Sequence, residues 1–109
     1  MARRAHWQRY EMQAQIISAV AHPIRVAIVD LLKDGELCVC EIAERLGAER
    51  SNVSRHLSVM LKAGVVKTRK QGLQVFYSLR TPCAVNFISC ATRTLKQNLR
   101  EHTRALSDD

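Results

Sequence analysis

Residues 49–64 read ERSNVSRHLSVMLKAG, and this stretch decides the fold. Its apolar side chains recur at helical spacing until Gly64 ends the pattern, and they are Val53, Leu57, Met60 and Leu61. A shorter pattern of the same kind closes at Gly47, with an apolar face of Val39, Ile42, Ala43 and Leu46. Two helices joined by a short turn have the dimensions of a helix-turn-helix, which we expect at about residues 38–63.

Beyond Gly64 the spacing changes from that of a helix to that of a strand. Residues 65–69, VVKTR, and 75–79, VFYSL, are rich in β-branched and aromatic side chains. Gln71-Gly72 between them is a turn signal. The sequence therefore predicts a β-hairpin with a basic tip, a wing, at about residues 65–79.

Further helices are expected on both sides of this unit. Residues 24–32 carry a helical apolar stripe, and residues 9–20 repeat apolar side chains at helical spacing. A long helix at about 82–105 exceeds what a domain this small needs for its own core. We expect it to pack, with the 9–20 helix, against a second copy. The fold class is mainly α with a β-hairpin wing: one dimeric winged helix-turn-helix domain over residues 1–109, in the order α-α-α-α-β-β-α.

The charge of the chain is concentrated in one third of its length. The net charge is +7, and residues 45–80 contain eight basic residues against Glu49 alone, which is also +7. In the remainder of the chain the basic and acidic residues are equal in number. Such a segment is expected to face a polyanion, and double-stranded operator DNA is the partner that a helix-turn-helix fits.

Apolar residues are distributed in short runs, and no stretch approaches the length that a membrane-spanning helix needs. We therefore expect no membrane partner and a cytoplasmic location. Cysteines in that compartment are kept reduced and more often serve metal or redox chemistry than structural disulfides. The chain has four of them: Cys38, Cys40, Cys83 and Cys90.

Candidate DNA contacts cluster in two places. The first two turns of the 49–64 helix offer hydroxyl, amide and cationic groups suited to phosphates and base edges in the major groove, namely Ser51, Asn52, Ser54, Arg55 and His56. Ser51 could serve only as a helix cap. The wing offers Arg69, Lys70 and Gln74, which could follow the backbone or enter the minor groove.

These features together resemble the ArsR/SmtB family of winged-helix metal-responsive and metalloid-responsive repressors, closest to the arsenite/antimonite-sensing repressors of arsenical-resistance operons. The resemblance covers nearly the whole chain and is carried by residues 21–25 (AHPIR), 36–41 (ELCVCE), 51–57 (SNVSRHL), 61–66 (LKAGVV), 69–72 (RKQG) and 76–79 (FYSL). It implies a symmetric homodimer that represses a resistance operon and leaves the operator when an inducer binds.

Two thiols two residues apart cannot face the same way on a regular helix, because that step rotates the side chain by about 200°. Cys38 and Cys40 could bind one ion only if Cys38 lies outside a helix that begins at Val39, with Glu41 in its first turn. The positive end of that helix is expected to favour the thiolate, the form that binds soft ions.

The resemblance implies that Cys38 and Cys40 form the inducer site. In the arsenite sensors a third cysteine lies one turn later, where this chain has Ala43, and the amino-terminal cysteines of the cadmium/lead sensors are missing before Cys38. Trivalent arsenic needs fewer thiolates than cadmium or lead, so arsenite or antimonite is the expected inducer, with cadmium or lead as an alternative. The possible third ligand is Cys83 or Cys90, although both could instead be buried at the dimer interface.

Three other functions compete with this hypothesis. A repressor of the same fold could sense oxidants or persulfide through its thiols. An enzyme using Cys and His is disfavoured, because the sequence has no phosphate loop and no Cys-His pairing at motif spacing. A constitutive architectural DNA-binding protein would ignore reagents that react with thiols. In the expected mechanism, drawing Cys38 and Cys40 to one ion disturbs the start of their helix and, through it, the recognition helix.

Overall fold

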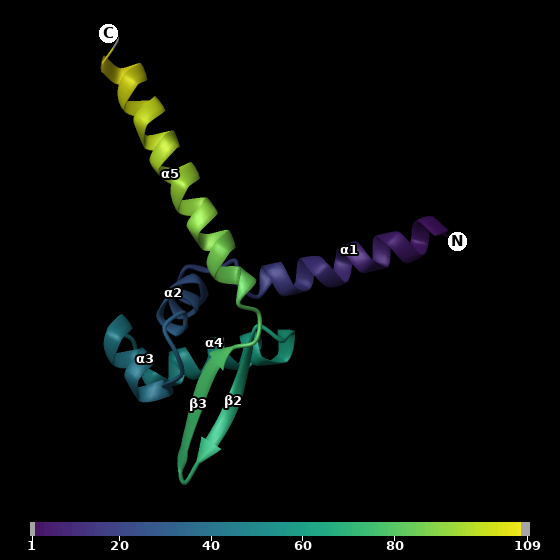
Figure 1. Cartoon of the computed structure of the whole chain (residues 1–109), viewed down its shortest axis with the longest axis vertical. Coiled ribbons are helices and arrows are strands. Elements are labelled where there is room, and N and C mark those ends of the chain that lie inside the picture. The colour runs from purple at the N-terminus through teal and green to yellow at the C-terminus, as the bar shows by residue number, and fades with distance from the viewer. Residues whose placement is uncertain (1, 108–109) are drawn as a thin grey trace.

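A computed structural model describes residues 2–107, with side chains from residue 6 onward, so Met1, Asp108 and Asp109 of the expected domain lie outside the described residues. The elements follow one another as α1 (Ala2–Ser18), α2 (Pro23–Leu32), β1 (Leu37–Cys38), α3 (Val39–Leu46), α4 (Arg50–Ala63), β2 (Val66–Gln71), β3 (Gln74–Leu79) and α5 (Cys83–Ser107). The winged helix-turn-helix prediction is confirmed, with the short strand β1 as an addition (Figure 1).

Local signals explain where the central helices begin and end. The His22 side chain accepts a hydrogen bond from the backbone N–H of Ile24 at the start of α2, and Pro23 occupies the first turn. Gly47 and Gly64 adopt left-handed backbone conformations after α3 and α4, with φ of 61° and 83°. Both glycines therefore end their helices as the sequence predicted.

The core lies where α2, α3, α4 and the start of the wing meet. The largest fully buried side chains come from these four elements only: Ile28, Ile42, Leu57, Met60, Val29, Val53, Val65 and Val66. No single helix within residues 6–107 is long and apolar enough to cross a membrane. The pair His6–Ser18 and Pro23–Leu32 meets the length and composition test only jointly, with a 78° bend between its halves.

The three strands form one antiparallel sheet in the order β1-β3-β2. In it Cys38 lies opposite Phe76, while β2 and β3 pair from Val66↔Leu79 to Gln71↔Gln74. The hairpin turn is therefore Gly72-Leu73, one residue later than the expected Gln71-Gly72. A tight two-residue turn keeps Gln71 in the ladder, which the propensity signal alone did not indicate.

The long helices α1 and α5 project away from the core in different directions (Figure 1). The radius of gyration is 17.5 Å, against about 13 Å for a compact domain of this length. Helix α1 begins seven residues earlier than the predicted 9–20 helix, because mostly polar residues continue it ahead of its apolar repeat, and it ends two residues earlier than predicted. Helix α5 contains no buried residue.

Candidate nucleic-acid interface and thiol pair

The start of α4 presents the first group of predicted DNA contacts. Ser51, Ser54 and Arg55 are exposed, on the side of the helix away from the buried Val53. Arg55 Nη2 donates to Asn52 Oδ1 at 3.0 Å, so these two side chains are held together on that surface. The arrangement offers a cation and two hydroxyl groups to a ligand outside the protein.

His56 is placed differently from its neighbours. It is half-buried, its ring lies 4.7 Å from that of His22, and Arg25 Nε on α2 donates to its Nδ1 at 3.1 Å. Burial lowers the pKa of His56, and the electrostatic effects of His22, Arg25 and Arg55 lower it further. His56 is thus a neutral imidazole that accepts at Nδ1 and has its Nε2–H free to donate. The sequence did not indicate the partnership with Arg25, which lies 31 residues away.

The wing presents the second group, but Arg69 is already engaged. Its Nε donates to Glu36 Oε2 at 3.2 Å, its Nη2 contacts the other oxygen of the same carboxylate, and its guanidinium lies 5.0 Å from the centre of the Phe76 ring. The hydrogen bonds from Arg69 lower the pKa of Glu36. We call this contact between Glu36 and Arg69 the wing latch. Lys70 and Gln74 are exposed near the tip, as the sequence predicted.

Cys38 and Cys40 occupy opposite environments. Cys38 is buried, with 8% of its surface exposed, and it is the N-cap of α3, whose first residue is Val39 as expected. Its backbone N–H donates to Glu41 Oε1 at 3.3 Å, which forms a capping box with the Cys38 side chain facing the Glu41 backbone. Cys40 is exposed in the first turn of α3.

The protonation of Cys38 differs from the expectation. The backbone N–H of Glu41 lowers the pKa of the thiol, but burial and the Glu41 carboxylate together outweigh it, so the pKa is raised. The helix end thus acts on the Cys38 thiol in the predicted direction, but burial and the Glu41 carboxylate, which the prediction did not include, reverse the net shift of its pKa in the free subunit. The reverse holds for Glu41, whose pKa is lowered by hydrogen bonds from the Cys38 thiol and backbone and by Arg45.

The other two cysteines lie on α5. Cys83 is its first residue, and both Cys83 and Cys90 are exposed free thiols in the subunit. Within residues 6–107 no group of three His, Cys, Asp or Glu side chains is close enough to hold a metal ion. A third ligand for the Cys38–Cys40 pair is therefore not assembled within the described part of one subunit.

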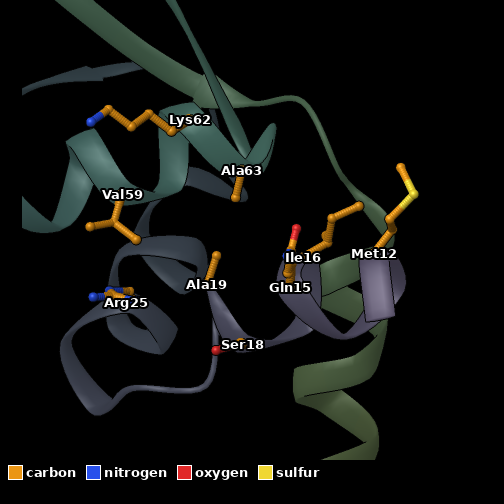
Figure 2. A pocket seen from close by; sticks show the side chains of 9 residues that line it. All are labelled: Met12, Gln15, Ile16, Ser18, Ala19, Arg25, Val59, Lys62 and Ala63. Atoms are coloured by element: carbon orange, nitrogen blue, oxygen red, sulfur yellow. The ribbon is translucent and has the colours of Figure 1, made fainter. Parts of the chain in front are cut away.

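A shallow hollow of about 480 Å³ lies between α1, α2 and α4 (Figure 2). Its walls are mostly apolar, with two cations, and its lining is Met12, Gln15, Ile16, Ser18, Ala19, Arg25, Val59, Lys62 and Ala63. The hollow contains none of the four cysteines. It is therefore separate from the thiol pair.

Comparisons with known proteins agree with this architecture. A family model described as "Bacterial regulatory protein, arsR family" matches residues 22–68, which span α2 to the start of the wing. A protein of Methanocaldococcus jannaschii described as an uncharacterized HTH-type transcriptional regulator is 41% identical over 71 residues, which are 64% of this chain and 80% of that protein.

Two solved structures are similar over most of the chain. Rv0081 of Mycobacterium tuberculosis is 32% identical over 100 residues, 91% of this chain and 88% of that protein, and its crystal structure matches with a TM-score of 0.74 over 86% and 95% of the two chains. The transcriptional repressor BigR from Xylella fastidiosa is 29% identical, with a TM-score of 0.69 over 83% and 92%.

Proposed function

Because this chain belongs to the ArsR family of bacterial regulatory proteins, which are DNA-binding transcriptional regulators and not enzymes, we propose that it binds double-stranded operator DNA as a homodimeric repressor. The observation that supports this most directly is that residues 45–80, which run from the end of α3 through α4 and the wing to Arg80, carry a charge of +7, equal to the net charge of the whole chain. The proposed place of action is the cytoplasm, where the DNA lies and thiols remain reduced.

In the proposed complex, α4 enters the major groove by its amino-terminal turns. Ser51, Asn52, Ser54 and Arg55 reach phosphates and base edges, and neutral His56 donates from Nε2. Lys70 and Gln74 approach the neighbouring backbone from the wing. Arg69 has its guanidinium on the Glu36 carboxylate, so it contributes less to DNA binding than the sequence alone predicted.

The homodimer is proposed from the surfaces of α1 and α5. Both helices carry large apolar side chains that the subunit leaves exposed: Trp7, Tyr10, Met12, Ile16 and Ile17 on α1, and Phe87, Leu95, Leu99 and Leu106 on α5. Apolar surfaces of this extent mark contact sites between proteins. A two-fold arrangement would also place two α4 helices for successive major grooves of one operator.

The proposed inducer is trivalent arsenic or antimony, bound by Cys38 and Cys40 of one subunit with an exogenous third ligand. The position of Cys38 supports this proposal, because the residue connects three parts of the subunit. It caps α3, it pairs with Phe76 of β3, and it lies two residues after Glu36 of the wing latch. To bind a metalloid the thiol must lose its proton and turn away from Glu41. That movement breaks the capping box next to the helix that supports α4, so inducer and DNA compete.

Operator binding under titration tests both parts of the proposal. A duplex selected by the wild-type protein from a random-sequence pool is labelled, and binding is followed by fluorescence anisotropy while arsenite, antimonite, cadmium or lead is added. Cys38→Ser and Cys40→Ser should stay bound in arsenite, whereas the matched controls Cys83→Ser and Cys90→Ser should be released as the wild type is. Normal release of Cys38→Ser and Cys40→Ser would refute the inducer site while leaving DNA binding intact.

A thiol redox or persulfide sensor is the second candidate, because the described residues of one subunit, 6–107, do not assemble a third ligand beside the pair. Exposed Cys40 would react first, followed by a disulfide or polysulfide with another thiol. Release by peroxide or persulfide that dithiothreitol reverses, together with indifference to arsenite, would favour this alternative. Release by cadmium or lead alone would favour a divalent-cation sensor.

A further inference from the structure

The tip of the wing holds an apolar side chain that the subunit does not cover. Leu73 is 105% exposed, so it contacts no side chain outside its own turn. Single exposed leucines are common on protein surfaces and need no explanation by themselves. What distinguishes this one is its position at the end of a cationic ribbon.

The turn presents Leu73 in a defined way. Gly72 has a φ of 63°, and no residue other than glycine has a positive φ among those described. A two-residue hairpin with glycine at its first central position and an ordinary φ at the second corresponds to a type II′ turn. Gln71 pairs with Gln74 directly below it. The leucine is therefore fixed at the tip of a regular ribbon and is not part of a loose loop.

The surroundings of Leu73 select a nucleic-acid partner. Residues 66–79 contain no acidic residue. Lys70 is exposed close to the tip, where it pairs with Val75, and Lys67 is exposed on the same strand toward the core, where it pairs with Ser78. A patch that combines cations with one protruding apolar side chain fits phosphates on both sides of an apolar gap. Stacked base pairs provide that gap, and leucine is among the side chains that proteins insert between base steps in the minor groove.

The dimensions of the wing allow this contact. Its strands have six residues each, which gives a ribbon of about 20 Å. The minor groove nearest to a major-groove contact lies half a helical turn away, about 17 Å. The wing also projects from the core on the side away from α1 and α5 (Figure 1).

We propose that Leu73 is an intercalating wedge, which enters the minor groove beside the site of α4 and kinks the operator toward the major groove. This proposal rests on the proposed DNA-binding function. It adds that the protein bends its operator, and that the bend depends on one apolar side chain and not on charge. The preferred step under the wing is a flexible pyrimidine–purine step, since that step unstacks most easily.

Two measurements distinguish the contribution of Leu73 from that of the lysines. Bending of the duplex reports on Leu73, and the salt dependence of binding reports on the cations. Duplex bending is measured by energy transfer between dyes at the two ends of the selected operator, and unstacking by 2-aminopurine placed at successive steps under the wing. Wild type should kink the duplex by about 20° or more per wing. Leu73→Ala should remove the kink and the 2-aminopurine signal and weaken binding about tenfold, with an unchanged salt slope.

Two control variants make the result specific. Leu73→Met keeps a long apolar side chain and should retain the kink. Lys70→Ala should leave the kink in place and reduce the salt slope by about 1.8, which corresponds to one phosphate contact per subunit. Circular dichroism should be unchanged in all three variants, because the substituted side chains are exposed.

Several outcomes would overturn the wedge. A wild-type complex without a bend, or an equal bend in Leu73→Ala, would refute it while leaving operator binding standing. Loss of the dimer in Leu73→Ala, seen by sedimentation, would assign the leucine to a contact between proteins. Failure of the wild type to select any duplex would refute the wedge together with the proposed function.

Discussion

Replacing Glu36 by glutamine should make DNA binding more sensitive to salt. In the wing latch, both oxygens of the Glu36 carboxylate contact the Arg69 guanidinium, and about half of the arginine side chain remains exposed. The substitution removes the negative charge and keeps the shape of the side chain. The Arg69 guanidinium of each wing can then contact a DNA phosphate, which adds two phosphate contacts in the proposed dimer.

The size of the effect follows from the number of counterions released. Each phosphate contact contributes about −0.9 to the slope of log affinity against log salt concentration, so Glu36→Gln should steepen the slope by about 1.8. The assay is operator anisotropy between about 50 and 200 mM salt. Arg69→Ala should leave the slope close to that of the wild type, because the latch already withholds this cation.

The double variant Glu36→Gln, Arg69→Ala completes the cycle. It should behave as Arg69→Ala alone, because the added contacts come from the released arginine. An unchanged slope in Glu36→Gln would show that Arg69 does not face DNA when it is free. A loss of slope in Arg69→Ala would show that DNA already displaces the latch in the wild type. Either result would refute the reasoning.

Three further predictions concern the recognition helix, the thiol and the histidine. Arg55→Ala should weaken operator binding by about 1–3 kcal/mol without changing the melting temperature, because the side chain is exposed; equal affinity would remove it from the contact surface. Glu41→Gln should lower the pKa of the Cys38 thiol and speed its alkylation near neutral pH, measured with the other three cysteines replaced by serine; an unchanged pH midpoint would contradict the assigned role of the carboxylate. The pKa of His56 is lower in the folded than in the unfolded chain, so the unfolded chain takes up a proton first as the pH falls below about 6.5, and the free energy of unfolding should decrease there until the folded pKa is reached. Denaturant titrations should show this dependence flattened in His56→Gln and retained in the exposed control His102→Gln, and a dependence that survives in His56→Gln would assign it to another group.

The parts of the fold that the sequence predicted depend on local signals. Apolar spacing and terminal glycines located α3 and α4, and the position of Val39 after Cys38 was predicted because two thiols two residues apart require it. Hydroxyl, amide and cationic residues at the start of α4 also proved to lie on its surface. Such features depend on residues that are close in the sequence, where helix geometry fixes their relation.

The features that the sequence did not indicate all join distant segments. Strand β1 consists of two residues, too few for any periodic signal, and exists because β3 pairs with it. The wing latch joins residues 33 apart, and Arg25 and His56 are 31 apart. The raised pKa of Cys38 likewise depends on burial, which is a property of the packed subunit. Contacts of this kind are decided by tertiary packing and leave no trace in local composition.

Helix α5 has 25 residues and buries none of them within its own subunit. Most helical stability in proteins comes from packing of an apolar face against other parts of the structure. In the proposed homodimer the exposed apolar face of α5 is covered by a second copy, so the amount of paired repressor would depend on how many copies the cell has made. A cell that dilutes this protein by growth would then lose the dimer, and with it the repression, before any inducer arrives.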